Sequence, residues 1–95
     1  MIKLTDDELK KVKNKVYIEY KNYIDKFDKK IIPELVEHTF NSKWDQYIDN
    51  HPEDLVKGKE EEIIYYVGIT CIMFINWIPN DESGQQRILK LIYNT

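Results

Sequence analysis

The sequence predicts an all-α fold, in which four helices form a small bundle-like single domain over residues 1–95. Three observations support this prediction. Apolar residues recur every three or four positions through much of the chain, which is the spacing of one face of a helix. Short polar links that contain proline or asparagine separate the periodic segments. Finally, 95 residues with 42% hydrophobic and 33% charged side chains fit one folded domain and leave no room for a second.

The first helix is expected over residues 6–30. Thr5 and Glu8 have the spacing of a capping box, in which each side chain bonds the backbone N–H of the other residue. Asp6 and Asp7 place negative charge in the first turn, where the helix dipole favours it. The apolar stripe that follows consists of Leu9, Val12, Val16, Tyr20, Tyr23 and Phe27.

The second helix is expected over residues 33–49. Pro33 fits the first position of a helix, where its missing N–H costs nothing. The apolar arc of this segment consists of Ile32, Leu35, Val36, Phe40, Trp44, Tyr47 and Ile48. The run from Asn50 to Pro52 ends the helix, and Leu55 and Val56 are expected to add one short helical turn.

The third helix is expected over residues 59–78, with three glutamates, residues 60–62, in its first turn. Residues 63–78 are nearly all apolar and rich in β-branched and aromatic side chains, so an α+β fold with buried strands here is the alternative. Length favours the helix, because no turn residue splits the run. A transmembrane span needs about 20 apolar residues, and this run is shorter and interrupted by Gly68 and Asn76.

The fourth helix is expected over residues 84–93. Pro79, Asn80 and Asp81 interrupt the chain before it, and Ser83 with Gln86 has the spacing of a second capping box. The apolar stripe of this segment consists of Ile88, Leu89, Leu91 and Ile92.

Charge and composition narrow the function. The net charge is −3, only one basic residue is an arginine, and residues 31–62 carry nine acidic residues against three lysines. Because phosphate contacts supply most of the affinity for nucleic acid, we expect no nucleic-acid partner. The single cysteine, Cys71, excludes an internal disulfide, and no secretory signal is evident, so we expect a cytoplasmic protein. Abundant lysine and isoleucine without alanine indicate a low-GC genome, bacterial or phage.

The third helix is the first candidate binding site. A helix that is apolar on every side must be covered on every side. One side of it is small and aliphatic, with Ile64, Gly68, Cys71 and Ile75, and is expected to approach a neighbouring helix closely. Its bulky side, with Tyr66, Met73 and Trp77, resembles the centre of a protein interface, formed with another protein or with a second copy. Complete wrapping by the other three helices is the alternative.

The second candidate is an acidic face that docks a protein with a basic surface. It consists of Glu34, Glu37, Asp45, Asp49, Glu53 and Asp54. An ordinary solvated face is the alternative. We predict no metal, because Glu34, His38 and Asp45 share a helix side but lack a fourth ligand, and no cofactor motif is present.

Catalysis has little support in the sequence. Two histidines, one cysteine in an apolar run and no glycine-rich loop do not provide an activated nucleophile or a phosphate cradle, so we expect no enzyme. We therefore predict a protein-binding module, a stoichiometric inhibitor or an immunity or antidote protein of a mobile element or toxin system. A homo-oligomeric structural or regulatory protein is the alternative, and a small DNA-binding regulator is disfavoured by charge.

Overall fold

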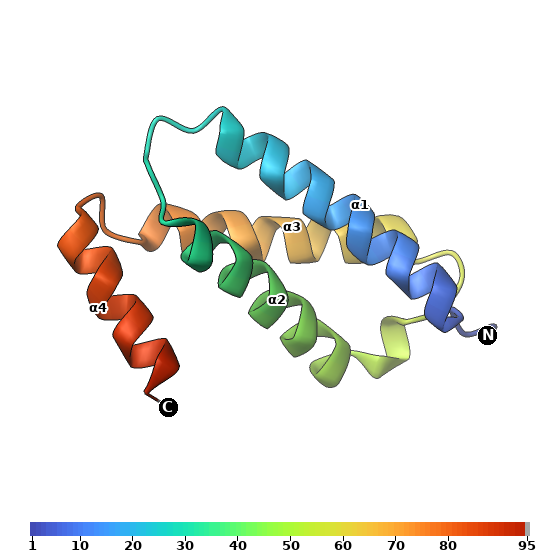
Figure 1. Ribbon diagram of the computed structural model, residues 1–95. Coiled ribbons are helices and arrows are strands. Elements are labelled where there is room, and N and C mark those ends of the chain that lie inside the picture. The colour runs from blue at the N-terminus through green and yellow to red at the C-terminus, as the bar shows by residue number, and fades with distance from the viewer. Residues whose placement is uncertain (95) are drawn as a thin grey trace.

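The computed structural model describes residues 1–94, which form an all-α fold of four helices (Figure 1). The elements in chain order are α1 (Asp6–Asp25), α2 (Pro33–Asn50), the single-turn 3-10 helix η1 (Pro52–Asp54), α3 (Glu60–Trp77) and α4 (Glu82–Tyr93). The predicted all-α, bundle-like fold class is therefore confirmed. The α+β alternative is wrong, because the apolar run from residue 63 onward lies in α3.

The first three helices form two layers. α1, α2 and α3 alternate in direction, and α3 crosses behind both of the others and packs against each (Figure 1). The shortest dimension of the molecule is 19 Å, close to two helix diameters of about 10 Å each. α4 lies beside α2 at the end of the molecule where α3 finishes. Consequently α3 has one layer of helices on its inner side and none on its outer side.

The start of α1 follows the prediction. The Oγ1 atom of Thr5 accepts a hydrogen bond from the backbone N–H of Glu8 at 3.1 Å, and the backbone N–H of Thr5 donates to Oε1 of Glu8 at 2.9 Å. The expected capping box is thus confirmed. Val12, Val16 and Tyr20 of the predicted stripe are buried.

The end of α1 differs from the prediction, because the helix stops at Asp25 and not at residue 30. The physical reason lies in Lys29, whose ammonium group donates to the backbone oxygens of Ile75 at 3.0 Å, of Asn76 at 3.2 Å and of Ile78. These carbonyls form the end of α3, where a cation satisfies unpaired acceptors and matches the dipole. The chain leaves its helical path so that Lys29 can cap α3.

The link from α2 to α3 also departs from the prediction. The helical turn expected at Leu55 and Val56 is wrong, since the turn occurs earlier, in η1. Val56 instead pairs with Lys3 in an isolated antiparallel bridge, which ties the N-terminal residues to this link. Gly58 then reverses the chain with φ of 101°, a conformation that favours glycine.

α4 begins two residues before the prediction, and its cap is Asp81 and not Ser83. The Oδ2 atom of Asp81 accepts from the backbone N–H of Gly84 at 2.8 Å, and the Ser83 hydroxyl donates to the same oxygen at 3.0 Å. An ionised carboxylate is the stronger acceptor for helix N–H groups, and these bonds hold the pKa of Asp81 below its usual value.

One buried glutamine attaches α4 to the rest of the fold. Gln85 is 1% exposed. Its Oε1 atom accepts from the backbone N–H of Ile32 at 2.8 Å, and its Nε2 atom donates to the backbone oxygens of Lys30 at 2.8 Å and Pro79 at 3.0 Å. We call this set of three bonds the Gln85 clasp. It joins the α1–α2 link, the α3–α4 link and the first turn of α4.

None of the helices within residues 1–94 combines the length and the apolar character that a bilayer span requires. The transmembrane alternative for the third helix thus has no support in the structure. The large apolar side chains that α3 exposes to solvent therefore need another explanation.

Candidate protein-binding surface

α3 has one buried side and one apolar side that faces outward. Ile63, Val67, Cys71 and Ile75 lie against α1 and α2 and are fully buried. On the opposite side, Tyr65 is 71% exposed, Tyr66 50%, Met73 66% and Trp77 69%. Together with the half-buried Ile69 and Ile72, these four residues form what we call the α3 outer face.

The α3 outer face presents about as much apolar surface as the largest patch on a typical monomer. A fully exposed aromatic side chain presents about 150–250 Å², so the exposed parts of the four large residues present on the order of 500 Å². The largest apolar patch on a typical monomer is about 300–600 Å² and commonly marks an interaction site. The alternative of complete wrapping by the other helices is therefore wrong, because α4 packs beside α2 and leaves this side uncovered.

Neighbouring rings hold parts of the α3 outer face in place. The ring of Tyr66 lies 5.3 Å from that of Tyr47 and 5.7 Å from that of His51, both at the end of α2 or beyond it. The ring of Trp77 lies 5.6 Å from that of Phe74. Side chains fixed in this way lose little conformational entropy when a partner binds. The three residues predicted for an interface, Tyr66, Met73 and Trp77, all lie on this face, and Tyr65 joins them.

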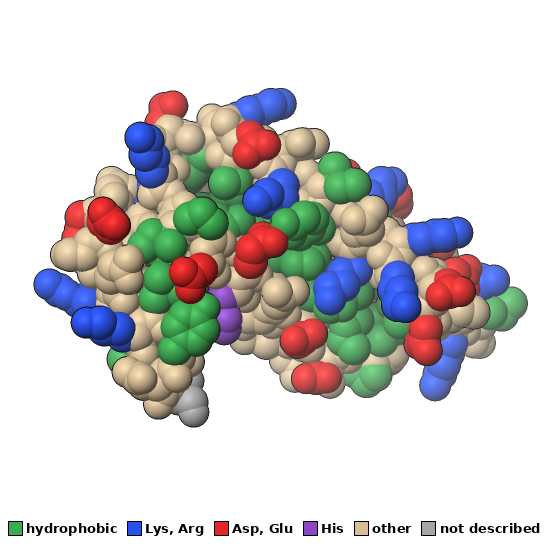
Figure 2. All heavy atoms as spheres, in the orientation of Figure 1, with side chains coloured by type: hydrophobic (Ala, Val, Ile, Leu, Met, Phe, Trp, Pro, Cys, Tyr) green, Lys and Arg blue, Asp and Glu red, His purple; other side chains and the backbone are tan. Residues whose placement is uncertain are grey.

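The predicted acidic face is divided in the structure. Glu34 and Glu37 each accept a hydrogen bond from a tyrosine hydroxyl, that of Tyr93 at 3.1 Å and that of Tyr17 at 2.6 Å. Asp45 and Asp49 are exposed on α2. In the view of Figure 2, acidic and basic side chains alternate over the surface and do not gather into a field of one sign.

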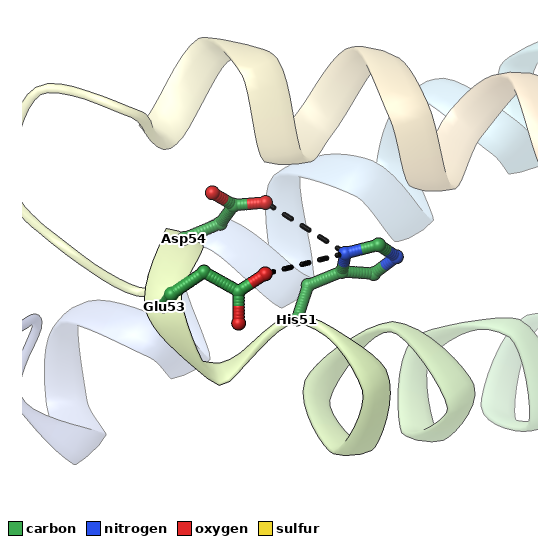
Figure 3. A group of neighbouring side chains, drawn as sticks. All are labelled: His51, Glu53 and Asp54. Carbon is green, nitrogen blue, oxygen red and sulfur yellow. Dashed lines mark ion pairs between the residues drawn. The ribbon is translucent and has the colours of Figure 1, made fainter.

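Glu53 and Asp54, the other two predicted acidic residues, belong to η1 and form a cluster with His51 (Figure 3). The Nδ1 atom of His51 lies 3.8 Å from a carboxylate oxygen of each. Asp54 is also held by Lys59 at 3.0 Å and by the Tyr47 hydroxyl at 3.3 Å. The hydrogen bond from Lys59 is the main reason that the pKa of Asp54 lies below its usual value, whereas burial raises the pKa of Tyr47 to about 12.

This cluster stabilises the link between α2 and α3. Within residues 1–94, one group of three side chains could hold a metal ion. It consists of His51, Glu53 and Asp54, whose potential ligand atoms lie within 4.8 Å of one another. Glu34, His38 and Asp45, the three residues considered from the sequence, do not form such a group. Asp54 already has two donors, so its carboxylate is engaged in hydrogen bonds that fix the turn.

A groove that the sequence did not predict lies between α2 and α4. It encloses about 340 Å³ and is lined by His38, Thr39, Ser42, Lys43, Gln46, Phe74, Ile88, Leu91 and Ile92. The ammonium group of Lys43 lies 5.2 Å from the centre of the Phe74 ring at its floor. Sequence periodicity gives no signal for such a groove, because it depends on the angle at which α4 leaves α2.

Cys71 has no environment for nucleophilic chemistry. It is fully buried on the inner side of α3, and burial raises the pKa of its thiol to about 12. Since the thiolate is the reactive form, this cysteine is a packing residue at neutral pH.

Comparisons with protein-family models, with curated proteins and with solved structures return no match to this chain. The case for a function therefore depends on the surfaces described above.

Proposed function

We propose that this protein is a non-enzymatic, cytoplasmic protein-binding module that acts by occluding a partner, as an inhibitor or as an antidote of the kind encoded by mobile elements and toxin systems. The observation that supports the proposal is the α3 outer face, an exposed apolar surface of two tyrosines, a methionine and a tryptophan. Tryptophan and tyrosine dominate the energy of protein interfaces, and methionine is enriched there.

A surface of this kind suits recognition better than catalysis. The six residues that form it include no carboxylate, imidazole, ammonium or thiol group. Binding there buries apolar area at roughly 25 cal/mol per Å², and the ordered rings of Tyr66 and Trp77 limit the entropic cost. A stoichiometric inhibitor needs only this, because covering the active surface of its target is sufficient.

The exposed carboxylates of α2 supply a second, weaker contribution in this proposal. Asp45 and Asp49 carry charges that steer a partner with a basic surface and raise its association rate. Reversal of these two charges is expected to slow association with little change in dissociation, and to remove much of the dependence on salt.

The test begins with affinity purification of the tagged protein from its natural host and native mass spectrometry of the intact complex. Affinity for the partner chain is then measured for two variants, Trp77→Asp on the α3 outer face and Leu91→Asp on α4. Both positions are 69% exposed, and Leu91 lies on a different surface, the groove between α2 and α4. We expect Trp77→Asp to weaken binding at least about 30-fold, as for an interface hot spot, and Leu91→Asp to have little effect. A partner held equally by the parent protein and by Trp77→Asp would contradict the proposal.

A further inference from the structure

We infer that the groove between α2 and α4 binds a small amphiphilic carboxylate, a fatty acid of medium chain length, with its head group on the α2 wall and its tail against α4. The groove shares no residue with the α3 outer face, so this inference stands apart from the proposed function. Three features of the described residues support it: the different chemistry of the two walls, an unpaired cation where they meet, and the size of the groove.

The two walls of the groove differ in chemistry. The five residues that α2 contributes are all polar, whereas the residues from α3 and α4 are all apolar, namely Phe74, Ile88, Leu91 and Ile92. Leu91 and Ile92 follow Ile88 by three and four positions, so all three lie on one face of α4. A ligand that suits both walls has a polar head group and a hydrocarbon tail.

The charge of the groove lining is positive, although the surrounding sequence is acidic. Residues 31–62 carry nine acidic residues against three lysines, yet the lining includes Lys43 and no carboxylate. Lys43 is half-buried, and no carboxylate within residues 1–94 forms an ion pair with it. Its ammonium group lies 5.2 Å from the centre of the Phe74 ring, so the cation lies where the polar and apolar walls meet. Charges withdrawn from water are normally paired, and an anionic ligand supplies the missing partner.

The acidic side chains of α2 do not compete for this position. Glu34 and Glu37 bond tyrosine hydroxyls of other helices, and Asp45 and Asp49 are exposed and do not line the groove. His38, the other titratable residue of the lining, can add only positive charge. The lining therefore favours an anion over a cation.

A second donor lies beside Lys43. The hydroxyl oxygen of Ser42 accepts a hydrogen bond from Nε2 of Gln46 at 3.4 Å, which leaves its own O–H available. The two oxygens of a carboxylate can accept from the Lys43 ammonium and the Ser42 hydroxyl together. One lysine matches the single charge of a carboxylate, whereas a phosphate monoester carries nearly two charges and requires a second cation.

The size of the groove restricts the ligand to a free acid with a tail of medium length. Its volume of about 340 Å³ lies at the lower end of the range of about 300–1,000 Å³ for small-molecule pockets. The α2 wall from His38 to Gln46 is about 12 Å long at about 1.5 Å per residue, which matches an extended tail of medium length. A phospholipid with two long chains is too large for this space.

Binding is tested by adding decanoate to the full-length, isotope-labelled protein over about 0.05–5 mM and recording amide shifts by two-dimensional NMR. We expect saturable shifts around Ser42 and Lys43 in α2 and around Ile88 in α4, with a Kd below about 1 mM. Hexanoate should bind at least about tenfold more weakly, because its shorter tail buries less apolar surface. Decylamine, with the same tail and a positive head group, should also bind at least about tenfold more weakly. Absence of saturable shifts, shifts confined to the α3 outer face, or equal binding of decylamine would overturn the inference.

Two variants test the contact with Lys43. Lys43→Met removes the cation and keeps a side chain of similar length in the groove, so it should weaken decanoate binding at least about fivefold. Lys90→Met makes the same change at an exposed position of α4 outside the lining and should alter the affinity by less than about twofold. Equal losses in the two variants would reveal an effect of net charge alone and would overturn the contact. Groove shifts that appear when the protein is concentrated without decanoate would identify a second copy as the occupant and would also overturn the inference.

Discussion

Replacing Gln85 by leucine tests how α4 is held to the rest of the molecule. Leucine has a similar volume, so the substitution removes the polar atoms of the Gln85 clasp and leaves the packing space filled. The three backbone groups that lose their partner are the N–H of Ile32 and the carbonyls of Lys30 and Pro79, all within 3.0 Å of the glutamine side chain. Gln85 itself is 1% exposed, and its three hydrogen bonds are part-buried, so water reaches the vacated groups only in part.

The expected loss follows from these three groups. Each buried polar group without a partner costs about 1–3 kcal/mol, and removal of the buried glutamine amide recovers part of this. We expect the free energy of unfolding to fall by about 3 kcal/mol, which is a large fraction of the roughly 5–15 kcal/mol of a typical domain. For a chain of this size each kilocalorie corresponds to about 4–8 °C, so the melting temperature should fall by about 12–24 °C.

Urea titration followed by far-UV circular dichroism measures the change, with Gln86→Leu as the control. Gln86 is the next residue in α4 and is exposed, so its replacement should alter stability by no more than about 0.5 kcal/mol. Equal losses for the two variants would refute the reasoning, because the clasp would then contribute nothing beyond helix propensity.

Three further outcomes are expected. Lys29→Met should lower the free energy of unfolding by about 1 kcal/mol, measured by thermal unfolding, because the C-terminal carbonyls of α3 lose their cation. Lys30→Met is the control, and an equal loss in that variant would argue against capping by Lys29. Cys71 should react with a thiol reagent at pH 8 only after denaturation, since burial raises its pKa to about 12, and labelling of the native protein would contradict its burial. A hydrogen bond from Lys59 lowers the pKa of Asp54 below the usual 3.8, and a hydrogen bond from the backbone N–H of Gly84 lowers that of Asp81. The stability that these two carboxylates provide is therefore complete well above pH 3.8 and declines as the pH falls through the lowered pKa values. Urea midpoints that stay constant from neutral to strongly acidic pH would exclude this contribution.

Local signals in the sequence predicted much of the fold. The capping box at Thr5 identified the start of α1, and Pro33 identified the start of α2. The long apolar run without a turn residue distinguished a helix from two strands in α3. The bulky side of that run also predicted an interface at residues that the structure exposes, although it gave no indication that α4 would leave them uncovered.

Features that depend on distant contacts were missed. The stripe of α1 continues to Phe27, but the helix ends at Asp25 because Lys29 binds the end of α3, more than 45 residues away in sequence. The sequence prediction used Gln86, because its spacing from Ser83 suggested a capping box, and assigned no role to Gln85. Spacing cannot reveal that Gln85 bonds backbone groups in the α1–α2 link and in the α3–α4 link. The acidic residues of α2 were predicted to form one face, but Glu34 and Glu37 bond tyrosine hydroxyls of other helices.

The way α4 is attached has a consequence for the motions of the native protein. Its two buried side chains are Gln85 and Leu89, and Leu89 is the one side chain of α4 that belongs to the buried apolar core formed mainly by α1, α2 and α3. We expect a helix with so few buried side chains to open as a separate cooperative unit, so that its amide protons exchange with solvent while the other three helices stay folded. In that open state the groove loses its α4 wall, and Phe74 becomes accessible from the side of α2. We therefore expect a second apolar surface that is exposed only in a minor population of molecules.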